Sequence, residues 1–426
     1  MIWRILYNLL AAPLLKLGLL IAGLFSEKVR RGIKGRMGEG DRLRSARARC
    51  LEGSPRVLVH CASAGELESA IPIIREMKRQ SDVCIILSYY SPSAVNRVAG
   101  VDEISDHIYL PFDSPRRVRR LLDIIDPSLI LVIKHDLWPN LVWQAKKRNV
   151  PVVLANAYSR RDSMLLRQRM LIPFSRELNG SLAEIHAVTE SDASRWRFLS
   201  GRKVDVLATG DTRFDRVRER ALNSAGDQGE LKRRLSGMKV FVAGSTWPVD
   251  EKMFHDAWQD LSREGRLLML VPHEIGEEHL NQIEQEFAEF GVVRLSQLKP
   301  DNKETVLLVD QMGILAGLYG LGVGAYVGGG FGVGVHSVIE PAVFSIPVSF
   351  GPKYEMSPEA KELKRRKGAE LIEDSDALKH FMAACLDGQP SHLDIGKRAG
   401  EFVEEKAGVT RTLVTHLTQR YLTISG

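Results

Sequence analysis

The feature that most constrains the fold is a regular alternation of short apolar runs with amphipathic stretches, which occurs twice along the chain. From residue 56, the runs RVLVHCA, VCIILSYY, LILVIK, PVVLANA and EIHAVT alternate with segments that carry apolar residues at helical spacing. After a polar interval the pattern resumes with VFVAGS, LLMLVP, VVRL, TVLLVD, GAYVGG and IPVSFG. Strand–helix alternation predicts right-handed βαβ units and a parallel sheet. The sequence therefore predicts an α/β protein with two doubly wound domains.

The length of the chain agrees with two domains. A chain of 426 residues can form two domains of ordinary size, each with its own core. We expect a hydrophobic and basic segment at 1–50, a Rossmann-like domain at 51–210, a linker at 211–238 and a second Rossmann-like domain at 239–426. The final stretch, from about residue 392, has a helical pattern that allows it to pack back on the first domain.

The first 50 residues differ from the rest. Residues 8–25 form an apolar run interrupted only by Pro13 and Lys16, and residues 28–49 are rich in Lys and Arg. The basic flank argues against a cleaved signal peptide. The run is borderline for a spanning helix and fits an interfacial anchor equally well, with Lys16 reaching the headgroups. Positive charge next to the run predicts that the remaining chain lies on the cytoplasmic side. The alternative is a buried N-terminal helix.

The cysteines and the basic cluster argue against a disulfide-rich protein, a zinc protein and a nucleic-acid-binding protein. Cys50, Cys61, Cys84 and Cys385 lie far apart in the sequence, without a CxxC pair or a Cys/His cluster. We therefore expect neither a disulfide framework nor a zinc site. We expect the protein to lie in a reducing compartment, and Cys61 to lie in the core. Because the basic cluster lacks interleaved aromatic residues and known motifs, we expect no nucleic-acid partner.

Two carboxylates follow strands of the first predicted domain. In open parallel sheets, ligands bind at the carboxyl ends of the strands. Glu66 follows the first apolar run in CASAGELES, and Asp136 follows LILVIK in HDLWPN. Glu66 is a candidate general base, or an acidic residue that only complements a helix dipole. Asp136 is a candidate second carboxylate of the site, or an N-terminal helix cap.

A glycine-rich loop marks the second domain. GAYVGGGFGVGVHSVIEP, residues 324–341, follows a strand and precedes a helix that we expect to begin near His336. Such a loop lets the backbone approach a phosphate, and Glu340 on the helix suits ribose hydroxyls. The loop fits neither a dinucleotide fingerprint nor a Walker motif. It predicts a site for a nucleoside mono- or diphosphate sugar, with a purely structural glycine turn as the alternative.

Other strand ends of this domain carry weaker signals. Ser245 and Thr246 in VAGSTWP are candidate donors to an anion, or helix caps. His273, after LLMLVP, and Gly313, in VDQMGIL, also stand at strand exits, although a lone histidine is more often structural than a ligand.

Short motifs occur in a fixed order along nearly the whole chain. They are SAGE (63–66), DLWPN (136–140), NA (156–157), GDTRFD (210–215), AGST (243–246), DQMG (310–313), VGGG (327–330) and HSVIEP (336–341). In this order, and with the hydrophobic basic N-terminus, the chain resembles the 3-deoxy-D-manno-octulosonate (Kdo) transferases of lipopolysaccharide synthesis.

The resemblance implies a GT-B fold, with two Rossmann-like domains facing across a cleft. It implies an inverting transfer of Kdo from CMP-Kdo to a lipid A precursor (lipid IVA), without metal or cofactor, at the cytoplasmic face of the inner membrane. By the resemblance Glu66 is the general base, Asp136 a second essential carboxylate, and Arg213 replaces a lysine that stabilises charge on the leaving phosphate. The residues expected at the nucleotide sugar are Ser245, Thr246, Pro272, His273, Met312, Gly313, Gly330, Ser337, Val338, Ile339 and Glu340.

The chain also departs from the family pattern. Relatives commonly carry glutamate at the positions of Lys134, Asp136 and Ile314. They commonly carry lysine at the position of Arg213, arginine at that of His273 and asparagine at that of Ser337. These differences leave open a GT-B transferase or epimerase with another nucleotide sugar. A non-catalytic sugar-nucleotide-binding relative is a further alternative.

Overall fold

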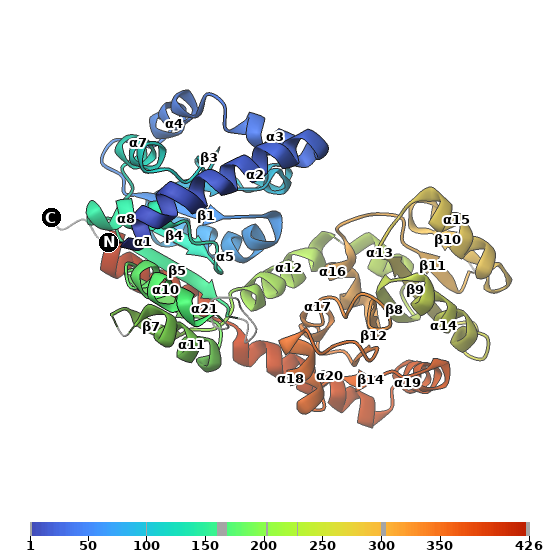
Figure 1. Ribbon diagram of the computed structural model, residues 1–426. Helices are drawn as coiled ribbons and strands as arrows, with labels where there is room; N and C mark the ends of the chain where they lie inside the picture. The colour runs from blue at the N-terminus through green and yellow to red at the C-terminus, as the bar shows by residue number, and fades with distance from the viewer. Residues whose placement is uncertain are drawn as a thin grey trace. The chain divides into compact units, whose positions relative to one another are not determined.

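The computed structural model describes residues 2–98, 100–159, 168–201, 203–227, 229–299 and 304–422. The chain forms two compact units (Figure 1). The first comprises Met1–Arg216 and Gly408–Gly426, and the second comprises Val217–Ala407. The polar interval that we expected to be a linker contains two helices, α12 (Arg213–Asp227) and α13 (Gly229–Arg234). The last segment of the chain thus belongs to the first unit.

The first unit is built on a seven-stranded parallel sheet of order β3-β2-β1-β4-β5-β6-β7. Its strands are β1 (Arg56–Cys61), β2 (Cys84–Tyr89), β3 (Asp106–Tyr109), β4 (Leu129–Ile133), β5 (Val152–Ala157), β6 (Glu184–Ala187) and β7 (Asp205–Ala208). Its helices after the N-terminal segment are α5 (Ala64–Gln80), α6 (Val95–Val98), α7 (Pro115–Ile125), α8 (Pro139–Lys147), α10 (Ile172–Asn179), α11 (Glu190–Ser200) and α21 (Val409–Leu417). The central strands are buried on both faces, as their continuous apolar runs predict.

Each face of this sheet has its own core. One core joins Leu58, Ile130 and Leu154 to α7, α8, α10 and α11. The other joins Val59, Leu131 and residues of α5 and α21. This is the doubly wound arrangement expected from the sequence.

The second unit repeats the architecture, with a parallel sheet of order β10-β11-β9-β8-β12-β13-β14. Its strands are β8 (Lys239–Thr246), β9 (Arg266–Pro272), β10 (Val292–Arg294), β11 (Val306–Leu308), β12 (Gly322–Val327), β13 (Val348–Phe350) and β14 (Glu370–Leu371). Its further helices are α14 (Pro248–Trp258), α15 (Glu277–Glu286), α16 (Leu315–Leu318), α17 (Ile339–Ala342), α18 (Pro358–Arg365), α19 (Ser375–Asp387) and α20 (Pro390–Lys406). The predicted pair of Rossmann-like domains is confirmed; that they face across a cleft stays a prediction.

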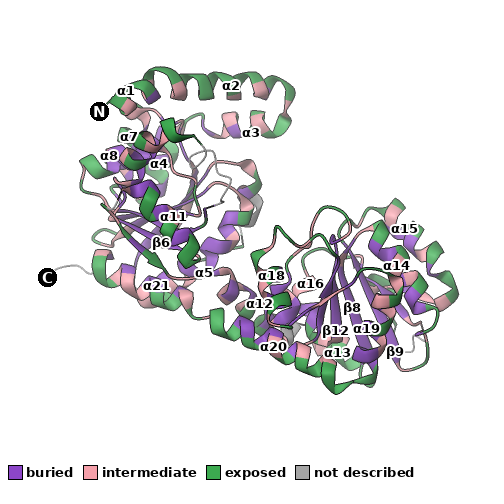
Figure 2. Ribbon diagram, turned by 60° about the horizontal axis from the view of Figure 1, so that its bottom comes forward, coloured by how far each residue is buried: buried purple, intermediate pink, exposed green. Residues whose placement is uncertain are grey.

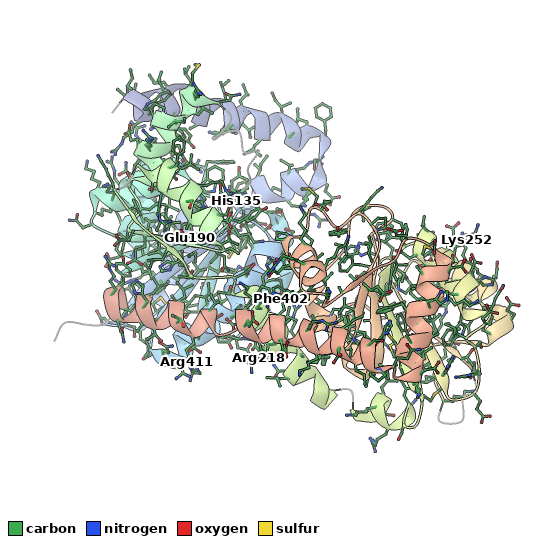
Figure 3. The ribbon with its side chains drawn as sticks, turned by 90° about the horizontal axis from the view of Figure 1, so that it is seen from below. His135, Glu190, Arg218, Lys252, Phe402 and Arg411 are labelled. Atoms are coloured by element: carbon green, nitrogen blue, oxygen red, sulfur yellow. A yellow bond between two sulfur atoms is a disulfide. The ribbon has the colours of Figure 1, made fainter. Side chains whose placement is uncertain are left out.

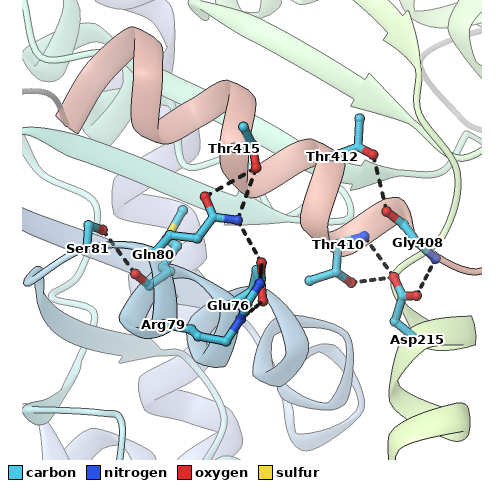
Figure 4. A network of polar contacts seen from close by, with 10 residues as sticks. Glu76, Arg79, Gln80, Ser81, Asp215, Gly408, Thr410, Thr412 and Thr415 are labelled. Atoms are coloured by element: carbon cyan, nitrogen blue, oxygen red, sulfur yellow. Dashed lines mark hydrogen bonds and ion pairs between the residues drawn. The ribbon is translucent and has the colours of Figure 1, made fainter.

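Polar contacts hold the helices that lead the chain into and out of the second unit. Arg218 of α12 pairs with Glu404 of α20 (Nε–Oε1, 3.2 Å), and Figure 3 labels Arg218 and the nearby Phe402. Within the first unit, Asp215 accepts hydrogen bonds from the N–H groups of Gly408 (2.6 Å) and Thr410 (2.7 Å) and from the Thr410 hydroxyl (Figure 4). Asp215 therefore caps the start of α21 and fixes the returning chain.

The N-terminal apolar run forms a continuous helical stretch. It consists of α1 (Ile2–Leu6), the π-helical turn η1 (Tyr7–Ala11) and α2 (Ala12–Phe25), and α3 (Glu27–Gly35) and α4 (Glu39–Ala48) follow. Ile2–Phe25 is long and apolar enough to cross a membrane, and only 6% of its most apolar window is buried. Exposed residues dominate α2 in Figure 2. The alternative of a buried N-terminal helix is therefore wrong.

One member of the basic flank has a structural role. The Arg36 guanidinium is buried, donates hydrogen bonds to the carbonyl groups of Leu110 and Tyr90, and lies 4.3 Å from the centre of the Tyr90 ring. Burial lowers the pKa of Arg36. Arg36 thus belongs to the packing of the first unit and does not face a membrane surface.

Cys50 and Cys84 form a disulfide with their Cα atoms 5.4 Å apart. The expectation of no disulfide is therefore wrong. The sequence separation of 34 residues hid the pair, because α4 returns the chain to the start of β2. Cys61 and Cys385 are free and buried, and Cys61 lies in the core as expected.

Hydrogen bonds join the N-terminal helix to the first unit at the start of α8. The Tyr7 hydroxyl donates to Asp113 (2.8 Å), and the side-chain amides of Asn8 and Asn140 bond to each other. The Asp113 carboxylate also accepts the backbone N–H groups of Asn140 (3.0 Å) and Leu141 (3.2 Å). Asp113 therefore caps α8 and anchors the apolar helix at once.

An Asp113→Ala variant should loosen both elements. It removes a helix cap and leaves the buried Tyr7 hydroxyl without its acceptor, which together should cost about 2–4 kcal/mol locally. Amide hydrogen exchange should speed up in α1, η1 and the first turn of α8. Asp123→Ala removes only an exposed pair with Arg148 and serves as the control. Unchanged exchange in both segments would contradict the anchoring role.

Candidate active site

Glu66 lies in the first turn of α5, directly after β1. Its carboxylate is buried and accepts the backbone N–H of Ala62 (2.5 Å), so it folds back over the strand exit. Burial raises the pKa of Glu66, the Ala62 N–H opposes this, and the nearby negative charge of Asp136 raises it further. A carboxylate held in this way binds a proton more readily than one that only complements a helix dipole.

Asp136 follows β4 and belongs to a buried polar chain. Its Oδ2 atom accepts hydrogen bonds from the Nε2 atom of His60 and the indole N–H of Trp138, each at 3.0 Å. Burial acts to raise the pKa of Asp136, but these hydrogen bonds outweigh it and the pKa is lowered. The helix that follows is capped by Asp113, so the alternative interpretation of Asp136 as that helix cap is wrong.

His60 is a residue of this site that sequence reasoning missed. It is fully buried in β1, and its Nδ1 atom lies 3.0 Å from the Ser88 hydroxyl. The Nδ1 atom also lies 3.2 Å from the carbonyl oxygen of Ser88, so both ring nitrogens are within hydrogen-bonding distance of oxygen atoms. A histidine inside the apolar run VLVHC, on the strand next to β4, was the available signal. Figure 3 labels His135, the exposed residue beside Asp136.

Arg213 opens α12 and is already engaged by a carboxylate. Its Nε and Nη2 atoms lie 2.8 and 2.7 Å from the Oδ2 atom of Asp211, and its side chain is 42% exposed. The neighbouring Thr212 is buried, exchanges hydrogen bonds with Asn156, and donates to the Ser69 carbonyl. The GDTRFD and NA motifs thus fix the backbone around Arg213.

The glycine loop of the second unit closes on itself. The N–H groups of Gly332 and Gly334 donate to the carbonyl of Gly329. A side chain at Gly328 would meet the Ser245 carbonyl oxygen at 2.1 Å, and one at Gly330 would meet the Gly351 Cα at 2.6 Å. At these two positions glycine is required by close backbone packing, in agreement with the structural alternative.

The helix after the loop begins later than expected. The N–H of His336 donates to the carbonyl of Gly328, and the helical turn α17 spans only Ile339–Ala342. The prediction of a helix that begins near His336 is therefore wrong, and a single turn supplies little of the dipole that we expected at a phosphate. Backbone hydrogen bonds within residues 328–336 hold the glycine loop in place instead.

Three aromatic rings stack at the carboxyl edge of the second sheet. The centre of the His273 ring lies 4.9 Å from that of Trp247 and 4.5 Å from that of His336, and the planes are nearly parallel. The Trp247 indole donates to the Nε2 atom of His336 (3.1 Å). Burial lowers the pKa of His336, and His273 adds to this. His273 is therefore part of a cluster, and Trp247 and His336 were not among the predicted site residues.

The other predicted nucleotide-site residues differ in their surroundings. Thr246 is buried and its hydroxyl donates to Glu251 (2.9 Å), whereas Met312 is 69% exposed. Ser245 and Gly313 have positive φ angles of 53° and 87°. The residues at the carboxyl ends of β8 and β9 and in the segments after β11 and β12 lie along one edge of the sheet, because parallel strands end on the same side. They include Ser245, Pro272, Gly313, Gly330, Ser337, Val338, Ile339 and Glu340.

Known proteins are similar to this chain in sequence and in fold. The family model of 3-deoxy-D-manno-octulosonic-acid transferase (kdotransferase) matches residues 31–216. The 3-deoxy-D-manno-octulosonic acid transferase of Haemophilus influenzae is 28% identical over 84% of this chain and 85% of its own length. That of Aquifex aeolicus is 28% identical over 73% and 80%. The chain is thus similar in sequence to Kdo transferases over most of its length. It is accordingly a glycosyltransferase.

Solved structures with low sequence identity share the architecture of this chain. UDP-GlcNAc 2-epimerase from Neisseria meningitidis has a TM-score of 0.60 at 14% identity and covers 86% of this chain and 100% of its own. A glycosyltransferase from Rickettsia africae has a TM-score of 0.55 at 13% identity and covers 88% and 100%. Together with the two parallel sheets, these likenesses show the GT-B fold.

An Asp136→Asn variant should lower the pKa of Glu66. The negative charge of Asp136 favours the protonated form of the neighbouring carboxyl, so its removal favours the ionised form. A ¹³C NMR titration of the Glu66 carboxyl, assigned with a Glu66→Gln variant, measures the shift. Asp126→Asn, on the surface of the same unit, should leave the titration unchanged. A Glu66 pKa that is equal in the intact protein and in Asp136→Asn would refute the coupling.

Proposed function

We propose that the chain transfers Kdo from CMP-Kdo to a lipid A precursor (lipid IVA), with inversion at the anomeric carbon. The observation that carries this proposal is the buried Glu66 carboxylate, held at a strand exit with a raised pKa beside the His60–Asp136 pair. A base with a raised pKa takes up a proton from a hydroxyl group more effectively than an ordinary exposed glutamate. Sequence similarity to Kdo transferases supports the reaction class.

The reaction divides between a base and a cation. Glu66 removes the proton of the acceptor hydroxyl, whose oxygen attacks the anomeric carbon of Kdo. The bond from that carbon to the CMP phosphate breaks, and CMP leaves with the electron pair. A single displacement inverts the anomeric configuration. Arg213, oriented by Asp211, is the proposed partner of the charge that develops on the leaving phosphate.

The first unit offers a route for a lipid acceptor. A cavity of about 170 Å³ lies between the apolar helix and the loops after β2, β3 and β4. Its walls are largely apolar and aromatic, with Lys16 on the helix side and Tyr90, Phe112 and Trp138 opposite. Trp138 stacks on Tyr90 at 4.6 Å and donates to Asp136. We propose that the acceptor reaches the Glu66–Asp136 pair past Trp138.

The exposed helix supports attachment to the inner membrane from the cytoplasmic side. Large apolar side chains of α2 are exposed, and the basic helices α3 and α4 follow it. Burial of such a face in a bilayer is favourable, and basic residues next to it favour the cytoplasmic leaflet. Attachment would confine the enzyme to the surface on which its lipid acceptor lies.

A different nucleotide sugar is the second candidate donor. The stack of Trp247, His273 and His336 occupies the sheet edge at which the resemblance leads us to expect an arginine, at position 273. An imidazole ring in an aromatic stack offers a phosphate fewer hydrogen-bond donors than a guanidinium does. The stack therefore favours a nucleotide-sugar donor that presents an apolar or aromatic face to it.

The deciding experiment is transfer from CMP-Kdo, generated in situ, to detergent-dispersed lipid IVA. Glu66→Gln should lower kcat by about 10²–10⁴-fold with little change in the KM for the donor, since the side chain acts in proton transfer. Glu76→Gln, on the same helix and paired with Arg79, should stay active. The anomeric configuration of the product, measured by NMR, tests inversion.

The outcomes separate the candidates. Undiminished transfer by Glu66→Gln would refute the role of the base. An intact protein that neither binds CMP-Kdo nor forms product would point to the second donor. Product formation without a lipid acceptor would indicate an epimerase-like or hydrolytic activity.

Membrane attachment has its own test. Replacing Leu14, Leu17 and Ile21 by serine removes three exposed apolar side chains from one face of α2. Each loss should weaken binding to anionic phospholipid vesicles by about tenfold. Transfer to a detergent-dispersed acceptor should persist. Serine at Val249 and Met356, which are exposed in the second unit, is the matched control. Equal flotation of both variants with vesicles would contradict attachment through α2.

A further inference from the structure

A carboxylate and two histidines meet where the C-terminal helix packs beside β6. Glu184 is the first residue of β6 and is fully buried, and His186 lies two residues further on the same strand. Side chains at i and i+2 of a strand point to the same face. His416, from α21, completes the group, and its side chain is 36% exposed.

The three side chains point their ligand atoms at one another. The Oε2 atom of Glu184 lies 2.9 Å from the Nε2 atom of His186 and 2.8 Å from the Nε2 atom of His416. The ligand atoms of all three residues lie within 4.8 Å of each other. A buried carboxylate between two imidazoles is a common donor set for zinc.

The other oxygen of Glu184 is fixed separately. Its Oε1 atom accepts the Tyr421 hydroxyl (2.7 Å) and lies 2.7 Å from the Nη1 atom of Arg420. Both residues belong to the π-helical turn η7 (Thr418–Leu422), which brings them to the same side as His416. Single π-helical turns are frequent at functional sites. Outer contacts of this kind orient a ligating carboxylate and leave Oε2 for the imidazoles.

His186 is held through one nitrogen alone. Its Nδ1 atom is buried and has no hydrogen-bond partner within the described ranges. Burial of an unpaired nitrogen is unfavourable, so the Nε2 atom needs a strong interaction to keep the ring in place. Coordination of a cation by Nε2 would provide that interaction.

We propose that Glu184, His186 and His416 bind a divalent transition metal of the zinc class. Zinc binds imidazole nitrogen and carboxylate oxygen at about 2.0–2.2 Å, so tetrahedral ligand atoms lie about 3.4 Å apart. The two Glu184–histidine distances would lengthen by about 0.5 Å on binding. A water molecule on the exposed side of His416 would complete the tetrahedron. The metal would fasten α21 to β6, apart from the residues proposed for transfer.

The site escaped sequence analysis because its ligands are distant in the chain. His416 and Glu184 are 232 residues apart, and neither lies in a Cys/His cluster. The expectation of no zinc site rested on sequence clustering alone. The fold, which returns the C-terminal helix to the first unit, brings them together.

The test is metal binding by the untagged full-length chain in detergent. The protein is stripped with a chelator, dialysed against zinc and measured by elemental analysis, with affinity from competition against a chromophoric chelator. The intact chain should retain a single zinc ion and unfold at a higher temperature with zinc than without it. Loss of a ligand in His416→Ala should weaken affinity by more than about 100-fold, since even outer-shell losses reach that size.

Three controls make the result decisive. His255→Ala removes a partly buried histidine that pairs with Glu289 in the second unit, and it should keep the zinc. His416→Cys, which restores a ligand, should recover binding and give cobalt(II) the visible absorption of a tetrahedral site. Circular dichroism shows whether each variant folds. A folded intact chain that takes up no zinc, or zinc retained in both His416→Ala and His186→Ala, would overturn the proposal.

Discussion

The constraint on which the structure depends is the burial of both faces of two parallel sheets. Strands such as β1, β4 and β9 are covered by helices on both sides, so their backbone and side chains offer almost no polar surface along their length. Polar groups are concentrated where the strands end. Glu66, Asp136 and the Trp247–His273–His336 stack all occupy such ends. His60 and Glu184 are examples of polar residues that lie buried within strands, and both are engaged in hydrogen bonds or ion pairs.

The same constraint explains how much of the fold could be predicted. Central strands form long apolar runs and were recognised. The edge strands β3, β7 and β14 are short or partly exposed, and their sequences carry no such run. The Cys50–Cys84 disulfide and the Glu184–His186–His416 group were missed for another reason. Each depends on segments that are distant in sequence and lie close together only in the folded domain. A local sequence pattern cannot predict such a contact.

The candidate site was predictable residue by residue but not as a network. Glu66 and Asp136 stand out because carboxylates after buried strands are unusual. The partner that contributes most to lowering the pKa of Asp136 is His60, which looks like an ordinary strand residue in sequence. In the second unit the glycine loop suggested a phosphate cradle, yet close packing against Ser245 and Gly351 already accounts for Gly328 and Gly330. The motifs GDTRFD and NA contribute mainly scaffold, through Asp215 at α21 and Thr212 against Asn156.

The anchor of the N-terminal helix has a geometric consequence. Tyr7 and Asn8 bond to Asp113 and Asn140, and Asn140 follows Asp136 by only four residues. The helix and the carboxylate pair therefore belong to the same compact unit. A helix that settles at a given depth in a bilayer sets the height of Asp136 above the hydrocarbon. With the membrane attachment proposed above, the depth of this helix in the bilayer would therefore determine how far from the lipid surface an acceptor hydroxyl group must lie to reach Asp136.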